Sequence, residues 1–130
     1  TILGKNVNLT SRLNGLCKIY KVKALITEDT KEKINDRFIK RILSNRELSR
    51  YNSISNDQRK LEYIAGRFAA KEAYTKVYKN FSTPLNFIDV EVLTDEFGAP
   101  YIESKYMPND NIKISISHSK NYVIAVCLKE

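Results

Sequence analysis

The sequence gathers charged side chains among small residues in one stretch, AGRFAAKEAYTK at positions 65–76. If this stretch is helical, Glu72 and Lys76 lie one turn apart on the same face, and the alanines let another backbone come close. Ionised groups are seldom buried unless they are paired or bind a ligand, so Lys71 and Glu72 within an apolar run need a partner. One carboxylate with one or two lysines suits a Mg²⁺-bound phosphate site. A surface glutamate that only pairs with Lys76 accounts for the same spacing about equally well.

The only histidine of the sequence, His118, lies in SISHSK at positions 115–120. A lone histidine is usually structural or simply exposed. Here the hydroxyls of Ser117 and Ser119 and the ammonium of Lys120 adjoin it at the expected end of a strand, where they offer several donors to one phosphate or diphosphate. A serine-hydrolase triad is not indicated because no G-x-S-x-G elbow is present, and no Walker-type loop suggests backbone binding of phosphate.

A basic stripe is expected on the helix that follows Thr27, where Arg37, Lys40 and Arg41 lie mostly opposite the apolar side chains. Most such stripes are solvated helix faces. A functional stripe would dock an acidic protein or a phosphate backbone, and Arg12 is a further candidate for the same surface. Nucleic-acid binding normally adds exposed aromatic residues or a recognisable motif, and neither is seen, so nucleic acid is not the expected partner.

The length and composition bound the class of protein. The 130 residues are enough for one domain, 1–130, with a real core. The net charge of +7 favours an anionic partner, although an AT-rich genome would also inflate the lysine count. Cys17 and Cys127 are far apart and form no CxxC pattern, so neither a zinc site nor a disulfide is indicated. No apolar run reaches the roughly 20 residues that a membrane span needs, so no membrane association is expected.

An α+β domain is predicted to position these groups, with helices early and an antiparallel sheet late. Thr27 and the two acids after it begin a helix that is predicted to run to about Leu43. Ser44 and Glu47 form a capping box that restarts a short helix through Tyr51. The third helix is predicted over 58–78, and strands over 2–13, 16–26, 87–93, 99–103, 112–118 and 122–128.

In four motifs the sequence resembles the holo-acyl-carrier-protein synthases, the short type of 4′-phosphopantetheinyl transferase. The motifs occur in the family's order: RFxxRILSxxEL at 37–48, YxAGRFAAKEAYxK at 63–76, DxxGxPY at 95–101 and SISHS at 115–119. The resemblance covers roughly 37–126 and implies the family's fold as a homotrimer, with three active sites at subunit interfaces. It also implies transfer of 4′-phosphopantetheine from coenzyme A to a serine of apo acyl carrier protein, with release of adenosine 3′,5′-bisphosphate, a step of fatty acid biosynthesis.

The resemblance further implies roles for individual residues. Glu72 would bind Mg²⁺, Lys76 would contact the diphosphate and assist the leaving group, and His118 of a neighbouring subunit would bind a phosphate of coenzyme A. The expected carrier-protein docking residues are Arg12, Arg37, Lys40 and Arg41, and the remaining expected cofactor-binding residues are Gly66, Arg67, Phe68, Lys71, Ser117 and Ser119.

Two positions depart from the family's pattern. Asn6 stands where relatives carry a Mg²⁺-binding aspartate, with Asn8 as the alternative alignment, and a neutral amide is a weaker ligand than a carboxylate. Glu28 and Asp29 are poor replacements. Ser49 stands where many relatives carry an acid proposed to orient a water molecule, so the general base is unassigned.

Two other functions remain open. A basic module that binds acyl carrier protein or coenzyme A without catalysis fits the substitution at Asn6, and metal-dependent turnover would distinguish an enzyme from it. A nucleic-acid-binding domain rests on charge only and predicts a steep dependence of binding on salt. The segment 14–26 is expected to be an insertion relative to bacterial members. The expected location is a bacterial cytoplasm, or a plastid stroma if a targeting peptide was removed.

Overall fold

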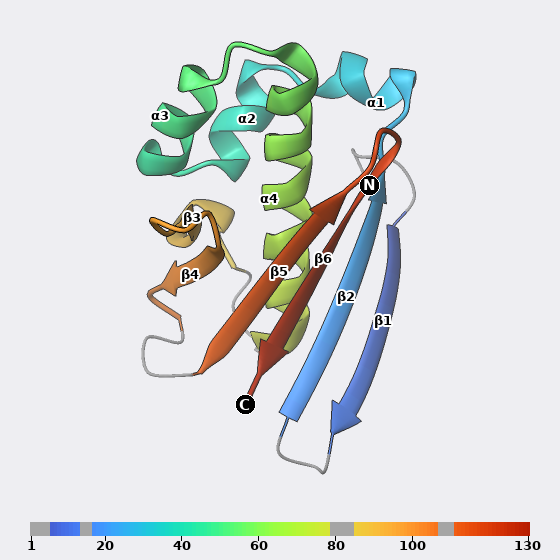
Figure 1. The fold of residues 1–130 in the computed structure, drawn as a ribbon, viewed down its shortest axis with the longest axis vertical. Coiled ribbons are helices and arrows are strands. Elements are labelled where there is room, and N and C mark those ends of the chain that lie inside the picture. Colours follow the sequence, from blue (N-terminus) through green and yellow to red (C-terminus); the bar gives the residue numbers. More distant parts are fainter. Residues whose placement is uncertain (1–5, 14–16, 79–84, 107–110) are drawn as a thin grey trace.

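The computed structural model describes residues 6–13, 17–78, 85–106 and 111–130, with only the backbone of residues 6–13 and 17. The architecture is α+β, as the sequence predicts: a four-stranded antiparallel sheet packs against one long helix, and shorter helices and a two-stranded hairpin lie beyond that helix (Figure 1). The helices are α1 (Glu28–Lys33), α2 (Asp36–Ile42), α3 (Asn45–Ser53) and α4 (Asp57–Tyr78), with a 3₁₀ turn η1 (Phe87–Asp89). The strands are β1 (Asn6–Leu13), β2 (Cys17–Leu25), β3 (Val90–Thr94), β4 (Pro100–Ser104), β5 (Ile112–His118) and β6 (Tyr122–Lys129).

The larger sheet has the order β1-β2-β6-β5, and each neighbouring pair of strands is antiparallel. β2 lies between β1 and β6, so most of the segment expected to be an insertion forms an interior strand of this sheet. Buried residues alternate along the strands, as period two requires when one face of a sheet is covered. On the covered face lie Tyr20, Val22 and Ala24 of β2 and Val123, Ala125 and Cys127 of β6.

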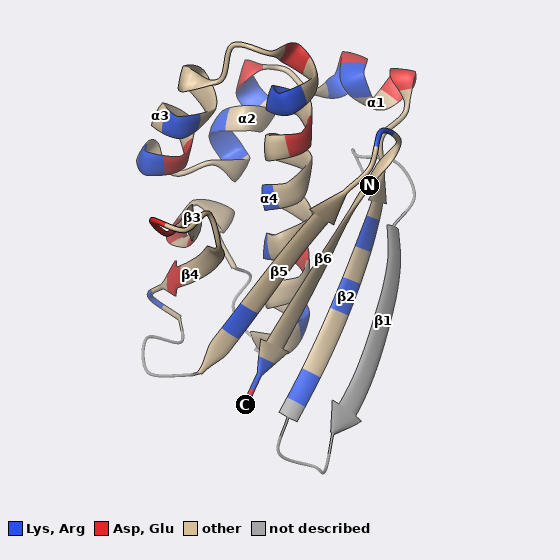
Figure 2. Ribbon diagram, viewed as in Figure 1, with Lys and Arg blue, Asp and Glu red and all other residues tan. Residues whose placement is uncertain are grey.

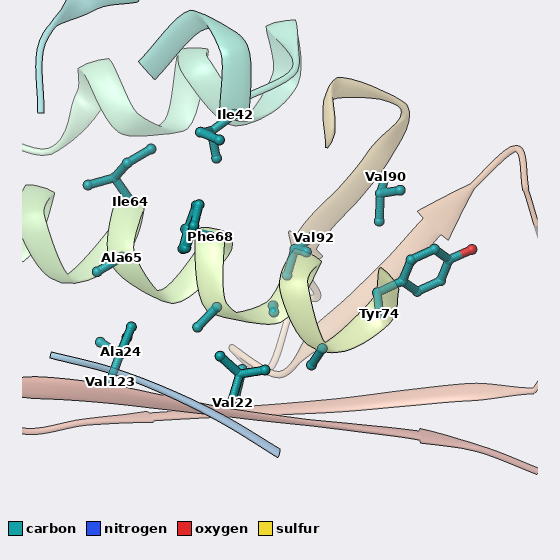
Figure 3. Packing of buried hydrophobic residues seen from close by; sticks show 14 of the residues in the cluster. Val22, Ala24, Ile42, Ile64, Ala65, Phe68, Tyr74, Val90, Val92 and Val123 are labelled. Atoms are coloured by element: carbon teal, nitrogen blue, oxygen red, sulfur yellow. The ribbon is translucent and has the colours of Figure 1, made fainter. Parts of the chain in front are cut away.

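The long helix α4 joins the two halves of the core. The alanines of its AGRFAAKEAYTK stretch are fully buried, and Figure 3 shows Val22, Ala24 and Val123 between the helix and the sheet. The small side chains therefore let the sheet approach closely, whereas Phe68 points the other way, toward Ile42 of α2. Among the described residues, neither α4 nor any shorter helix has the length and hydropathy needed to cross a membrane.

The single helix predicted over 28–43 is two helices, so that prediction was wrong. Ile34 is extended, with φ −82° and ψ 98°, and the side chain of Asn35 accepts a hydrogen bond from the backbone N–H of Phe38 at 3.0 Å. Asparagine satisfies this otherwise unpaired donor at a helix N-cap, so a new helix begins at Asp36. Apolar residues recur every four positions at Ile34, Phe38 and Ile42, on both sides of the break. The sequence pattern therefore indicates one continuous helix.

The strand predicted from Phe87 begins at Val90 instead. Residues Phe87–Asp89 form the 3₁₀ turn η1, and the side chain of Asn86 accepts a hydrogen bond from the backbone N–H of Ile88 at 3.3 Å. This turn leads directly into β3, which pairs with β4. The hairpin turn between them was predicted, and Gly98 adopts φ +85° there, a conformation that favours glycine.

Candidate active site

Glu72 borders a cavity of about 650 Å³ between α2, α4 and the segment around η1. Lys40 and Arg41 of α2 and Phe68 of α4 also line it. The fold thus brings together the expected metal ligand, one expected cofactor residue and two residues of the expected docking surface. The other lining residues are Phe38, Ile42, Leu85, Asn86, Phe87 and Ile88.

The Glu72 carboxylate is half-buried at this cavity. Burial raises the pKa of Glu72 above its ordinary value, and the positive charge of Lys76 opposes the shift. Within the described ranges, neither a hydrogen bond nor an ion pair holds the carboxylate, so the surface pair with Lys76 is not formed. A partly dehydrated carboxylate oxygen without a partner is well suited to a hard divalent cation, and Glu72 therefore fits a role as a Mg²⁺ ligand.

The neighbouring Lys71 has a different environment from the one expected of a cofactor-binding residue. Its side chain is fully buried, and its ammonium lies 2.6 Å from Glu47 Oε1. It also donates hydrogen bonds to the carbonyl oxygens of Ile42 at 2.5 Å and Phe87 at 2.9 Å. Burial lowers the pKa of Lys71, while the Glu47 carboxylate opposes that shift. All three donors of the ammonium are therefore engaged inside the protein.

Glu47 is the other member of this buried pair. It completes the predicted capping box of α3, where its Oε1 accepts a hydrogen bond from Ser44 N–H at 3.0 Å. Its Oε2 accepts one from the backbone N–H of Val92 in β3 at 2.9 Å. One carboxylate thus fixes the start of α3, the buried ammonium of α4 and strand β3.

His118 borders a second cavity, of about 370 Å³, further toward the beginning of α4. Its Nδ1 lies 2.6 Å from Glu62 Oε2, and 54% of the His118 side chain is exposed. Three arginines line the same cavity, so positive charge exceeds negative charge around it, as a phosphate site requires. The lining residues include Arg50, Arg59, Glu62, Tyr63, Arg67, Thr94 and His118.

Arg67 is held in place by the hairpin and by an aromatic ring. It donates hydrogen bonds to Val92 O at 3.3 Å and Thr94 Oγ1 at 3.0 Å, and its guanidinium lies 4.1 Å from the ring centroid of Tyr63. Burial lowers the pKa of Arg67, but an arginine remains charged in proteins. Arg67 is therefore a preorganised cation at the second cavity.

The two cavities lie apart on one chain. Glu72 lines the first cavity and Glu62 lines the second. The two residues are ten apart in α4, which is about 15 Å along the helix axis. The structure therefore brings His118 together with Arg67 but not with Glu72 or Lys76.

The remaining expected site residues are scattered. Arg37 and Lys76 are exposed, Ser117 is exposed on β5, and Ser119 belongs to the turn before β6, where its N–H donates to Tyr122 O at 2.8 Å. Gly66 faces the sheet, and a Cβ there would lie 3.2 Å from Ile116 Cγ2. The backbones of Asn6, Asn8 and Arg12 lie in β1, whereas their side chains fall outside the described residues.

Several residues that line or support the two cavities were not predicted from the sequence. The i, i+4 spacing of Tyr63 and Arg67 could have indicated their contact. Glu47 was identified only as a capping residue, and no local signal links it to Lys71, 24 residues away. Glu62, Arg50 and Arg59 carry no signal beyond their charge. In the part of the chain that the structure describes, no three His, Cys, Asp or Glu side chains cluster as a metal site, so a bound cation would rely on few protein ligands.

Comparisons with known proteins show which sequences and solved structures the chain is similar to. The family model of the 4′-phosphopantetheinyl transferase superfamily matches residues 25–127, which leaves β1 and most of β2 outside the match. A holo-[acyl-carrier-protein] synthase of Oceanobacillus iheyensis is 44% identical over 91 residues, 70% of this chain and 76% of that protein. The crystal structure of a holo-(acyl-carrier-protein) synthase from Bacillus anthracis in complex with CoA (3′,5′-ADP) has a TM-score of 0.71 at 33% identity, covering 85% of this chain and 94% of that one. The Helicobacter pylori synthase in complex with coenzyme A has a TM-score of 0.67 at 28% identity, covering 85% and 99%.

Proposed function

The chain belongs to the 4′-phosphopantetheinyl transferase superfamily, and from this premise we propose that it is a holo-acyl-carrier-protein synthase. It transfers 4′-phosphopantetheine from coenzyme A to a serine of apo acyl carrier protein and releases adenosine 3′,5′-bisphosphate. The observation that carries the proposal is the cavity in which Glu72 lies beside Lys40 and Arg41. A carboxylate suited to a metal-bound diphosphate is there next to cations suited to an acidic protein.

The main requirement of the reaction is that the negative charge of the diphosphate is neutralised, and no covalent intermediate with the enzyme is needed. Glu72 would hold Mg²⁺ with Asn6 as the second protein contact, and the ion, when bound, neutralises charge on the diphosphate. The carrier serine oxygen attacks the phosphorus that bears pantetheine, and the bond from that phosphorus to the bridging oxygen breaks. Lys76 stabilises the charge on the departing adenosine bisphosphate. Ser49 offers no carboxylate as a base, so the serine proton passes to water.

The carrier protein docks on α2. Arg37, Lys40 and Arg41 are exposed on this helix, and Figure 2 shows basic segments of α2 and α3 close to each other. Arg12 of β1 is proposed to extend the surface. Because acyl carrier protein is acidic, these charges would raise the association rate, and added salt would lower it.

Coenzyme A places a phosphate in the cavity around His118. Arg67 is already fixed there by its hydrogen bonds, and Arg59 adds positive charge. Ser117 and Ser119 are proposed to contribute hydroxyl donors at the rim. Two neighbouring cations and a histidine suit a phosphate dianion better than any neutral ligand.

A homotrimer with active sites between subunits is part of the proposal. Because His118 and Glu72 are separated on one chain, the phosphate cavity of one subunit can complete the Glu72 cavity of the next. The sheet offers a surface for such contacts: Ile124 and Val126 alternate with the residues that face α4, and no described element covers their face in Figure 1. The similar proteins include synthases of bacteria and of Plasmodium yoelii, so the proposed location is a bacterial cytoplasm, or a plastid stroma if a targeting peptide was removed.

Mass spectrometry of apo acyl carrier protein tests the function. The carrier protein is incubated with the chain, coenzyme A and Mg²⁺, with EDTA in a parallel sample. We expect a mass gain of one phosphopantetheine that EDTA abolishes and that Glu72→Gln does not support. Binding of coenzyme A without any mass gain would instead identify a non-catalytic binding module, the reading that the asparagine at position 6 favours.

A further inference from the structure

The buried ammonium of Lys71 has no part in the reaction as described above. Three oxygen atoms surround its Nζ, from Glu47, Ile42 and Phe87, at 2.6, 2.5 and 2.9 Å. Three acceptors around one nitrogen require three donors, which only the charged form of lysine supplies. A charge fully removed from water is costly, so this arrangement needs a structural or functional reason.

The carbonyl partners of Lys71 belong to two walls of the Glu72 cavity. Ile42 is the last residue of α2, where helix carbonyls lack partners within the helix and attract a cation. Phe87 is the first residue of η1. Both residues line the cavity, and Lys71 itself directly precedes Glu72 in α4. One side chain therefore joins the three elements that enclose the proposed reaction.

Glu47 also holds the ammonium, through its Oε1 atom. It does not line that cavity, and its own position is fixed by Ser44 at the start of α3 and by Val92 of β3. Lys71 is thus linked to α3 and β3 through Glu47, and directly to the carbonyls of α2 and η1.

We propose that Lys71 is a positioning residue that sets the distance between α2, η1 and the Glu72 segment of α4, and that it does not touch coenzyme A. The inference rests on the proposed function, because the reacting groups lie between these walls. Arg41 immediately precedes Ile42, so the same contact fixes the docked carrier protein relative to Glu72. A cofactor contact would require Lys71 to leave all three oxygen partners and its buried position.

A pair of variants separates positioning from general stability. Glu47→Gln removes the counter-charge of the buried ammonium, which lowers stability, but leaves the ammonium bound to both carbonyls, whereas Glu47→Gln/Lys71→Met removes both charges together. Both are assayed with wild-type protein at a temperature where circular dichroism shows all three folded. We expect Glu47→Gln to keep kcat within about threefold and the double variant to lose about tenfold or more, because small misplacements of reacting groups are costly.

The Michaelis constant for coenzyme A provides the second readout. It should stay within about threefold in the double variant, because the cavity around His118 and Arg67 lies elsewhere on α4. A double variant with the kcat of Glu47→Gln would overturn the inference. An inactive wild-type chain would instead remove the proposed function and the inference with it.

A crystal structure of the wild-type protein with coenzyme A and Mg²⁺ decides the matter even if the double variant does not fold. We expect Lys71 Nζ to remain within hydrogen-bonding distance of the Ile42 and Phe87 carbonyls. An ammonium turned toward a phosphate of coenzyme A would refute the positioning role.

Discussion

Lys71→Met alone should reduce the stability of the protein strongly. The substitution leaves the Glu47 carboxylate fully buried with its cationic partner gone. Breaking a buried ion pair in this way typically costs about 3–5 kcal/mol. For a domain of 130 residues, that loss corresponds to a fall in Tm of about 11–18 °C.

The loss should also depend on pH in a defined direction. Without Lys71, the Glu47 carboxylate is a buried charge with no counter-charge, and taking up a proton removes the cost of that charge. The folded variant then binds more protons than its unfolded chain, so the stability of the variant falls as pH rises. Acidification from pH 7 toward pH 5 should therefore narrow the gap between variant and wild type.

Urea unfolding followed by circular dichroism at pH 7 and pH 5 measures both effects, at one protein concentration because association also stabilises the folded state. Val123→Ala is the control: it removes apolar volume from the fully buried interface of α4 with the sheet and changes no charge. Its deficit should be nearly the same at both pH values. A Lys71→Met deficit below about 1 kcal/mol, or one that does not change with pH, would show that the buried charge is not the cause.

Three further outcomes follow from the site. The rate of transfer should fall on acidification, because protonated Glu72 binds no cation. Burial raises the pKa of Glu72, so the fall should begin at a higher pH than it would for a solvent-exposed glutamate. A pH–rate profile that does not fall at acidic pH would argue against Glu72 as the metal ligand. Arg41→Glu should raise the KM for carrier protein about tenfold at low salt and by a smaller factor at high salt, while the KM for coenzyme A changes little. The control Lys33→Glu on α1 should leave both Michaelis constants nearly unchanged. Mixing inactive Glu72→Gln and His118→Ala chains under subunit exchange should restore activity, because some interfaces then pair two intact residues; mixtures as inactive as either parent would place the site within one chain.

The placement of the α4 residues on the faces of a helix could be predicted from local spacing. Glu72 and Lys76 share a helix face, and the alanines mark the face that the sheet covers. Ser44 and Glu47 were correctly identified as a capping box, because its two hydrogen bonds join residues three apart. These features depend on neighbours in the sequence, so one sequence is enough to find them.

The features that were missed depend on tertiary contacts or on competing local signals. The pair of Lys71 and Glu47 forms only when α3 packs against α4, so this pair could not be found from local spacing. Asn35 does carry an N-cap signal, but the apolar period around it favoured an unbroken helix. At Phe87 the apolar run favoured a strand, whereas the Asn86 side chain stabilises a 3₁₀ turn.

The position of β2 inside the larger sheet has a consequence for how the chain reaches its native state. The hairpin of β1 and β2 involves close neighbours in sequence, but Lys18 pairs with Lys129, 111 residues further on. Such long-range pairing is slow, because a large loop must close before the contact forms. During synthesis on the ribosome, the helices can form before the sheet that covers the alanine-rich face of α4. That sheet is completed only after β6 has left the ribosome. A nascent or truncated chain without β6 would therefore expose this face and depend on chaperones to avoid aggregation.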